Sequence, residues 1–255
     1  MTSQRMRAET LLKHFGMINY AVPIKRLEFC IPDLFLKNFE IEKFNVREKE
    51  VGFVSVVSFI DTHFSFPKSL PYLNLSFAQT NHRMYIKNRK TGKRGVWFFG
   101  TTLGSNWVYI PKTLWKMPWH HAKYQLDCSF NSSAQRYEKY RFNIRSSWCE
   151  AEIDIEDTGK PVSLLEGFRS LEEMKRILTH PMDGFYQRSD KKIGTYSVLH
   201  PEIQPTIGQS KSLYFSFYEQ AEILTKEEMK TPHSIFIAPE VEFKINLPPR
   251  CLEIS

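Results

Sequence analysis

The chain has 255 residues, of which 42% are hydrophobic and 25% are charged, as in ordinary globular proteins. Its 35 basic and 28 acidic residues give a net charge of +7, which raises the question of a nucleic-acid partner. No segment approaches the run of about eighteen apolar residues that a membrane helix needs, and neither a repeat nor a Pro/Gly/Ser-rich linker divides the chain. We therefore expect one domain over residues 1–255, without membrane association and located in the cytoplasm.

The cysteines indicate a reducing compartment. Cys30, Cys128, Cys149 and Cys251 are far apart, and no C-x-x-C pair occurs among them. The apolar stretch LLKHFGMINYAV is interrupted by polar residues and no small-residue cleavage pattern follows it, so we do not interpret it as a secretion signal. We therefore expect free, buried thiols rather than disulfides.

The first half of the chain predicts one helix followed by strands. Residues 3–15 are helix-forming and end near Gly16, which predicts a helix. Residues 51–64, VGFVSVVSFIDTHF, are rich in Val and Phe with intermittent alternation, which predicts a strand. NHRMYIK and GVWFFGTTL, residues 81–87 and 95–103, flank a basic turn and together predict a β-hairpin.

Two short helices are predicted farther along the chain. Residues 105–116 begin at the capping residue Ser105, and Pro111 predicts a kink or a late start. Pro118 disfavours helical geometry before it and places a switch to strand there. Residues 170–178 begin with a capping box and carry an apolar stripe at helical spacing. Further strands are expected at 119–130, 140–144, 147–155, 194–199 and 212–224.

The positive charge is concentrated in one segment, residues 83–95. It contains six basic residues and no acid: Arg83, Lys87, Arg89, Lys90, Lys93 and Arg94. The sequence NRKTGKR has the composition of a hairpin turn, in which basic side chains are simply solvated. No helix-turn-helix, zinc-finger or RNP pattern accompanies it, so we favour the solvated turn over a nucleic-acid interface.

The stretch KMPWHHAKYQL contains two adjacent histidines, His120 and His121. Consecutive side chains of a strand point to opposite faces, so the two imidazoles cannot bind one metal ion together. Metal-binding spacings such as H-x-H, H-x-x-x-H or H-E-x-x-H are absent from the sequence. We therefore expect no metal and no cofactor.

Motifs for nucleophilic or phosphate chemistry are also scarce. The sequence contains no G-x-S-x-G nucleophile elbow and no glycine-rich phosphate loop with its lysine. Lys112, Lys116 and Lys123 are local candidates for a Schiff-base amine, although lysine side chains are mostly exposed. The residues themselves name no reaction.

Several motifs, in order, resemble the YqjF-like family of uncharacterised bacterial proteins. They are FGMINYAVP, VGFVSVVSFIDTHF, NHRMYIKNRKTGKRGVWFF, MPWHHAKY, ILTHPMDGFYQR and YSVLHPE. This family is similar in fold to acetoacetate decarboxylase, and the resemblance spans about residues 15–224. It implies a mainly β (α+β) fold: a twisted antiparallel sheet that closes into a cone-like β-barrel around a cavity, with a few short helices.

The resemblance also bears on the chemistry. In acetoacetate decarboxylase the Schiff-base lysine follows a proline at the start of a strand; if Pro118 is that proline, Trp119 occupies the lysine position and His120 that of its cationic neighbour. A competing register through YIPK places the amine at Lys112. The resemblance therefore implies a similar β-barrel around a cavity, with chemistry different from that of acetoacetate decarboxylase.

Our leading hypothesis is a barrel that binds a small carboxylate or enolate-like ligand. Its predicted ligand-binding residues are Arg83, Tyr85, Trp97, Trp119, His120 and His121. The alternative for these residues is structural, with Arg83 paired to a buried acid and the aromatic rings filling the core. Two other functions stay open: a Schiff-base lyase using Lys112 or Lys123, and a basic-patch binder of nucleic acid or an acidic protein. The oligomeric state cannot be inferred from these residues.

Overall fold

The protein is built mainly of strands, with a few short helices between them. The computed structural model describes residues 6–68 and 70–252. The strands are β1 (Met6–Pro23), β2 (Phe39–Ile41), β3 (Phe44–Val46), β4 (Lys49–Phe66), β5 (Leu70–Asn88), β6 (Arg94–Leu103), β7 (Trp119–His121), β8 (Lys123–Asn131), β9 (Arg136–Arg145), β10 (Ala151–Pro161), β11 (Asp183–Gln187), β12 (Ile193–Leu199), β13 (Thr206–Phe215) and β14 (Ser234–Cys251). The helices are α1 (Ile24–Phe29), α2 (Asp33–Asn38), the 3₁₀ helix η1 (Asn106–Val108), α3 (Tyr109–Leu114), α4 (Leu171–Leu178), α5 (Ser216–Gln220) and α6 (Lys226–Lys230).

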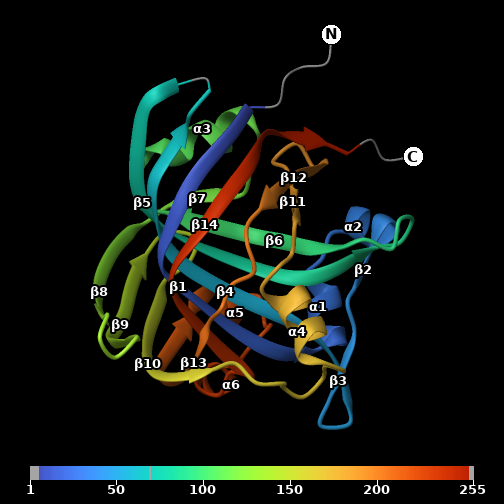
Figure 1. The fold of residues 1–255 in the computed structure, drawn as a ribbon. Helices are drawn as coiled ribbons and strands as arrows, with labels where there is room; N and C mark the ends of the chain where they lie inside the picture. Colours follow the sequence, from blue (N-terminus) through green and yellow to red (C-terminus); the bar gives the residue numbers. More distant parts are fainter. Residues whose placement is uncertain (1–5, 69, 253–255) are drawn as a thin grey trace.

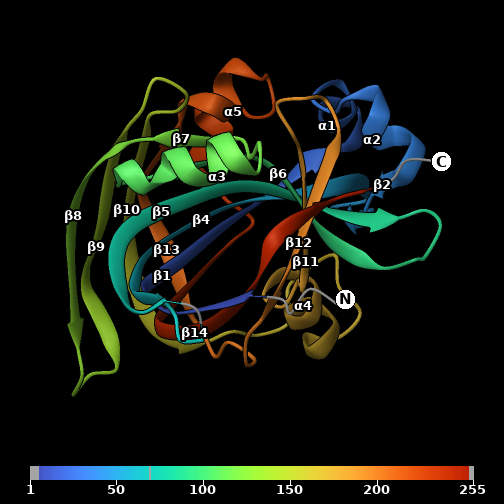
Figure 2. The same ribbon diagram turned by 90° about the horizontal axis from the view of Figure 1, so that it is seen from above.

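Seven of the described strands close into a barrel. Their order is β1-β4-β5-β6-β11-β12-β14, and β14 pairs back with β1 to complete the ring (Figures 1 and 2). The pairings within the ring are antiparallel except that of β11 with β6, which is parallel. The predicted fold class, an antiparallel sheet closing into a barrel with a few short helices, is confirmed.

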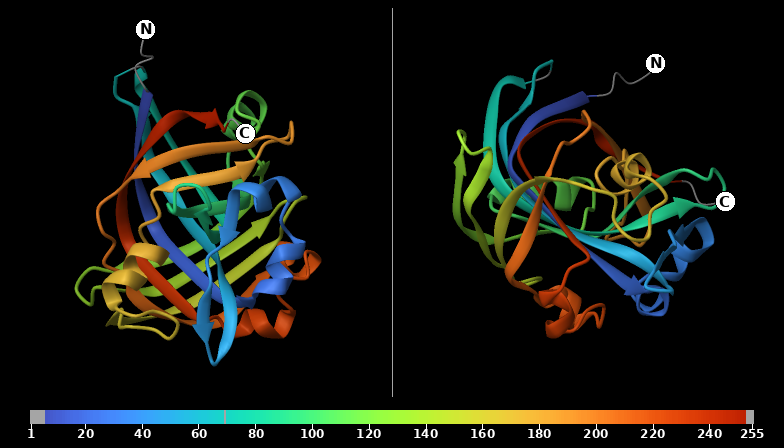
Figure 3. Two further views of the ribbon diagram at one scale, coloured as in Figure 1. Left: turned by 90° about the vertical axis from the view of Figure 1, so that its right-hand side faces the viewer. Right: turned by 60° about the horizontal axis from the view of Figure 1, so that its bottom comes forward.

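A second layer of strands covers one side of the barrel. The sheet continues from β14 through β13, β10 and β9 to β8, and these strands stand beside the barrel in Figure 2. Helices α1 and α6 meet outside the barrel, where Arg26 forms an ion pair with Glu228 (2.8 Å); the blue and orange-red helices adjoin in the left view of Figure 3.

The apolar side chains of β4 are buried on both faces of the sheet. Phe53 and Val57 belong to the cluster that includes the barrel interior, whereas Val54 and Val56 pack in the cluster between the barrel and the outer strands. Because neither face meets water, the sequence here is nearly continuous in apolar residues instead of strictly alternating. This explains the intermittent alternation of the predicted strand.

The predicted helix over residues 3–15 is wrong where it can be compared. Residues 3–5 lie outside the described residues, and residues 6–15 form part of β1. This strand pairs with β14 from Met6↔Leu247 to Asn19↔Ser234 and with β4 along its other edge. Two partner strands supply hydrogen-bonding neighbours along most of β1, so tertiary pairing overrides the local helical preference.

The other predicted elements are close to the observed ones, with two corrections. The hairpin of β5 and β6 is confirmed, and so is α4, where the Ser170 side chain accepts a hydrogen bond from the Glu173 backbone N–H. The predicted helix over 105–116 is confirmed with a late start, since an η1 turn precedes α3. The strand predicted over 119–130 is broken at Ala122 into β7 and β8, and the strand predicted over 212–224 ends at Phe215, where α5 begins.

All four cysteines are free, as predicted. Only Cys149 is fully buried, however; Cys30 and Cys128 are partly buried and Cys251 is exposed. None of the helices that the structure describes has the length and apolar character to span a membrane.

Candidate functional site

A cavity of about 390 Å³ lies inside the barrel, and all seven barrel strands contribute side chains to its wall. Segments around α3 and between α4 and β11 complete the lining. Its apolar part includes Phe15, Phe59, Phe64, Phe77, Phe98, Phe243, Trp107, Trp115 and Trp119. The centre of the barrel is therefore not filled by side chains, and its volume is within the range of about 300–1,000 Å³ that is usual for small-molecule sites.

Strand β5 contributes the longest row of lining residues. Side chains of a strand alternate between its faces, so every second residue of β5 faces the cavity. The row consists of Leu73, Leu75, Phe77, Gln79, Asn81 and Arg83. Its first three members are apolar and its last three are polar, which gives the cavity an apolar half and a polar half along this strand.

Arg83 is a partly buried cation at the polar end of this row. Among the described residues, no carboxylate oxygen lies within 4.0 Å of its guanidinium nitrogens. Nη2 makes two long contacts, 3.4 Å to Met17 Sδ and 3.4 Å to the Leu178 carbonyl oxygen, and Nε is buried without a hydrogen-bond partner. The guanidinium carbon lies 5.7 Å from the centre of the Tyr85 ring. The positive charge is thus only weakly compensated by the protein.

Asn81 adds a hydrogen-bond donor next to this cation. Its side-chain oxygen accepts hydrogen bonds from Gln79 Nε2 (3.0 Å) and Thr101 Oγ1 (2.8 Å). These bonds fix the orientation of the amide and occupy its oxygen, so the NH₂ group is left to donate to a group in the cavity. Asn81 and Arg83 are two residues apart on β5 and face the same way.

Asp61 is a buried carboxyl in the lining, farther toward the apolar half. It lies opposite Phe77 in the pairing of β4 with β5, is 3% exposed, and accepts a hydrogen bond from Thr10 Oγ1 (3.0 Å). Burial raises the pKa of Asp61 to about 7, although the Thr10 hydrogen bond acts in the opposite direction. A substantial fraction of this carboxyl is therefore protonated at neutral pH.

His200 lines the cavity on the side of β12. Its ring stacks on Phe243 at 4.3 Å between centroids and meets His180 edge-on at 4.5 Å, and its Nδ1 donates to the Pro201 carbonyl oxygen (2.9 Å). Burial lowers the pKa of His200 to about 4, and the nearby His180 and Arg83 also lower it. This imidazole is therefore neutral at pH 7.

Of the six predicted ligand-binding residues, Arg83 and Trp119 line the cavity. Tyr85 is 1% exposed and lies beyond the lining, where its hydroxyl group bonds Ser55 Oγ (2.7 Å) and donates to the Leu178 carbonyl oxygen (3.0 Å). Trp97 lies on the outer face of β6 and packs edge-on against Phe35 at 4.9 Å. Its neighbour Phe98 takes the inward position.

The two histidines face away from the cavity in different ways. The His120 ring stacks on Trp148 with 4.7 Å between centroids, and burial, with the nearby Lys112, lowers the pKa of His120 to about 4. His121 is exposed, and its carbonyl oxygen accepts a hydrogen bond from Ser146 Oγ (2.8 Å). Neither imidazole is part of the lining. In the described part of the chain, no three His, Cys, Asp or Glu side chains cluster in a way that would hold a metal ion.

The lysines of the Schiff-base alternative lie on the surface. Lys112 on α3 and Lys123 on β8 are exposed, and neither belongs to the cavity wall. The described lining contains no lysine at all, and at the position after Pro118 it presents the indole of Trp119.

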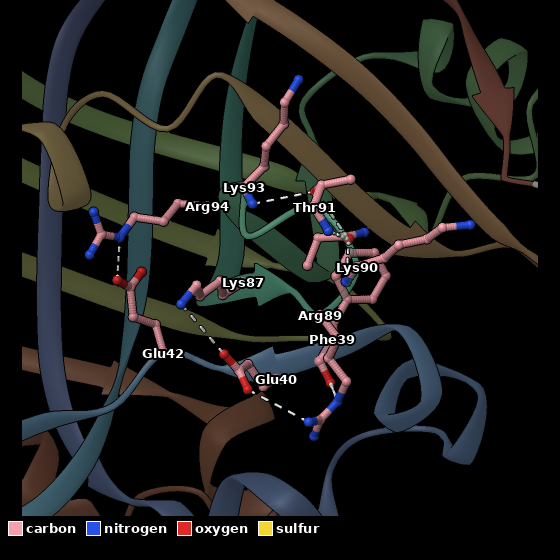
Figure 4. A network of polar contacts seen from close by, with 10 residues as sticks. Phe39, Glu40, Glu42, Lys87, Arg89, Lys90, Thr91, Lys93 and Arg94 are labelled. Carbon is pink, nitrogen blue, oxygen red and sulfur yellow. Dashed lines mark hydrogen bonds and ion pairs between the residues drawn. The ribbon is translucent and has the colours of Figure 1, made fainter.

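The basic segment spans the end of β5, the turn and the start of β6, and three of its six basic residues pair with acids of β2 and the residues after it. Glu40 pairs with Lys87 (3.9 Å) and Arg89 (3.6 Å), and Glu42 pairs with Arg94, as Figure 4 shows. Arg89 Nε also donates to the backbone oxygens of Leu36 and Phe39 (3.0 Å each). These contacts neutralise part of the charge that the sequence concentrates in this segment.

Sequence reasoning missed most of the polar lining residues, which include Asp61, Gln79, Asn81, Asp183 and His200. Gln79 could have been found by counting back from Arg83 in steps of two, because that spacing keeps a strand residue on the same face. Asp61 is the only acid in the run VGFVSVVSFIDTHF, and a lone carboxyl in an apolar strand is itself an indication of a functional or paired group. His200 had no comparable local pattern.

Solved structures with a similar fold include two kinds of enzyme. The enduracididine biosynthesis enzyme MppR with HEPES buffer bound matches with a TM-score of 0.58 and 8% identity, over 99% of this chain and 89% of that chain. MppR complexed with pyruvate matches with a TM-score of 0.53 and 9% identity, over 99% and 92%. Acetoacetate decarboxylase from Legionella pneumophila subsp. pneumophila str. Philadelphia 1 matches with a TM-score of 0.54 and 12% identity, over 96% and 87%. At these identities the likeness shows the fold.

At the level of sequence, the comparison with curated proteins gives no match. A family model described as an uncharacterized conserved protein, DUF2071, matches residues 10–242. The predicted resemblance to the YqjF-like family, with the fold of acetoacetate decarboxylase, is thereby confirmed. The chain belongs to the DUF2071 family.

Proposed function

We propose that the barrel binds a small carboxylate through Arg83. The observation that carries this proposal is Arg83, a residue of the cavity lining whose guanidinium group has no carboxylate partner among the described residues. A charge removed from water without a counter-ion is costly, so such a group is usually paired or kept for a ligand. The planar guanidinium matches a carboxylate in geometry, and charge-assisted hydrogen bonds of this kind are among the stronger ones in proteins.

The neighbouring groups fit the same ligand. Asn81 lines the cavity from the same face of β5, and because its side-chain oxygen is occupied by Gln79 and Thr101, its NH₂ group is the neutral donor that it offers to a carboxylate oxygen. His200 is held neutral, so it does not repel Arg83 and is able to accept a proton or a hydrogen bond. The complex of MppR with pyruvate, a small carboxylate, is a further argument by similarity of fold alone.

The structural alternative is that Arg83 serves only to cap the end of α4. The Leu178 carbonyl already accepts a hydrogen bond from the Tyr85 hydroxyl at 3.0 Å, whereas Arg83 Nη2 approaches it only to 3.4 Å. Hydrogen bonds of this type are usually 2.7–3.2 Å long, so the contact of Arg83 with the Leu178 carbonyl oxygen is too weak to account for the position of the guanidinium group.

The experiment is a titration with pyruvate monitored by tryptophan fluorescence, because Trp107, Trp115 and Trp119 line the cavity. Replacing Arg83 by Met removes the charge but keeps much of the side-chain volume. We expect the Kd to rise at least about tenfold, since hydrogen bonds to charged groups contribute roughly 1.5–3 kcal/mol. Lys90→Met, which removes the same charge from the exposed turn, is the matched control and should leave the Kd unchanged.

Equal pyruvate affinities for the two variants would contradict the proposal. A Schiff-base lyase is not supported, because no lysine lines the described cavity. Borohydride trapping with a β-keto acid tests it directly: we expect no adduct, and a covalent adduct on Lys112 or Lys123 would restore that function.

A further inference from the structure

We propose that the natural ligand is an amphipathic carboxylate, with a carboxylate head at Arg83 and an apolar arm long enough to reach the apolar half of the cavity. This inference rests on the proposed function and specifies its ligand class. The observation behind it is the division of the cavity along β5, where Leu73, Leu75 and Phe77 are followed by Gln79, Asn81 and Arg83 on the same face.

The length of this row sets the scale of the ligand. Leu75 and Arg83 are eight residues apart, which corresponds to roughly 25 Å along a strand. Pyruvate at Arg83 would leave most of this row without contact. An alkyl or aryl arm that follows β5 would instead place its apolar surface against apolar side chains, which is favourable in proportion to the area buried.

The remaining walls of the outer half are also apolar. Phe64 faces Leu75 across the pairing of β4 with β5. Ile110 and Leu114 of α3 complete this part of the lining, and α3 lies close to the upper end of β5 in Figure 1. The acid in this region, Asp61, is engaged by Thr10 and largely shielded from water, so it does not provide an open anionic wall.

The opening of the cavity is apolar as well. Trp107, Ile110 and Leu114 line the cavity and are at the same time 43%, 39% and 68% exposed, which places them at its mouth. Large exposed apolar side chains gathered at one place mark a binding surface more often than a solvated one. A small hydrophilic acid bound at Arg83 would not contact these rim side chains, whereas an apolar arm that reaches the mouth would pack against them.

The test is a series of straight-chain carboxylates, from acetate through butanoate, octanoate and dodecanoate to hexadecanoate, titrated against the protein. We expect the affinity to rise about fourfold for each added methylene group up to the length that fills the cavity, because each buried methylene contributes a nearly constant increment. Octylamine, which has the same arm and the opposite charge, should bind at least tenfold more weakly than octanoate.

Two variants locate the arm. Leu75→Trp fills the outer half, and we expect it to weaken binding of hexadecanoate, whose arm is long enough to extend from Arg83 toward Leu75, at least tenfold more than pyruvate binding. Because a larger side chain in the wall carries a risk of misfolding, Leu114→Gln at the exposed rim is the second variant. We expect it to weaken binding of the long carboxylate as well, by a smaller factor than Leu75→Trp does. Lys90→Met on the distant turn is the control that should change neither affinity.

The failure of this inference is distinguishable from that of the proposed function. If affinity does not increase with chain length while Arg83→Met still weakens pyruvate binding at least about tenfold, the amphipathic ligand is refuted and the carboxylate site stands. If octanoate and octylamine bind equally and Arg83→Met has no effect on either, the carboxylate site itself is refuted, and the inference that depends on it falls with it.

Discussion

Replacing Asp61 by Asn should make the protein more stable at neutral and alkaline pH and have little effect in acid. Asp61 is buried in the cavity wall and its pKa is raised from 3.8 to about 7. The first cause is loss of hydration, which disfavours the charged form; the Thr10 hydroxyl group donates to the carboxyl and offsets only part of this. Asn keeps the shape and the acceptor oxygen but never ionises.

The sign and size of the effect follow from proton linkage. Between pH 3.8 and about 7 the carboxyl is ionised in the unfolded chain but protonated in the folded protein. The unfolded state therefore binds fewer protons, and the free energy of unfolding falls by about 1.4 kcal/mol per pH unit. Summed over this window the cost is at most about 4 kcal/mol, and above pH 7 it stays constant.

The assay is urea unfolding of the wild type and Asp61→Asn at intervals from pH 4 to pH 9. We expect the difference in the free energy of unfolding to move in favour of the variant as pH rises to about 7 and then to level off. Thr10→Val, which removes the hydrogen bond donor and keeps the carboxyl, is the control and should raise the pKa further, shifting the plateau to higher pH. A difference that is independent of pH would show that Asp61 is hydrated and ionised throughout.

Two further predictions concern His200 and Trp97. Burial lowers the pKa of His200 to about 4, so below pH 6.5 the unfolded chain binds a proton that the folded protein does not, and the stability contributed by the neutral imidazole is lost as pH falls toward 4. His200→Gln should therefore lose less thermal stability than the wild type between pH 6.5 and 4.5. An equal loss in the two proteins would contradict this. Trp97 packs on the outside of the barrel and is only 3% exposed, so Trp97→Ala should destabilise the protein by about 3–5 kcal/mol in urea unfolding. The carboxylate affinity of the folded variant should stay at the wild-type value. A large change in that affinity would place Trp97 in the ligand site after all.

Local sequence patterns were sufficient to predict those structural features that depend on residues close together in the chain. The β5–β6 hairpin has a turn whose backbone is organised by the Asn88 side chain, which accepts hydrogen bonds from the backbone of Lys90 and Thr91. The Ser170 cap and the late start of the helix near Pro111 are similarly local. Such features are predictable because the interactions that stabilise them are a few residues apart in the chain.

The faces of the strands were predictable only in part. Alternation correctly separates His120 from His121, but it does not say which face meets the cavity. Trp97 and Phe98 are both large, apolar and buried, one outside the barrel and the other inside. When both faces of a strand are covered, hydrophobicity no longer distinguishes the interior from the exterior.

The sequence by itself determined a β-rich chain, the hairpin that contains Arg83, and the short helices near Pro111 and after Ser170. Only the tertiary structure decided that residues 6–15 form a strand, that the ring closes between β1 and β14, and that Arg83 meets a cavity without a carboxylate partner among the described residues. The pairing Met6↔Leu247 joins residues from opposite ends of the chain. No local pattern encodes such a contact, because its free energy comes from strands and side chains that are distant in sequence and become neighbours only on folding.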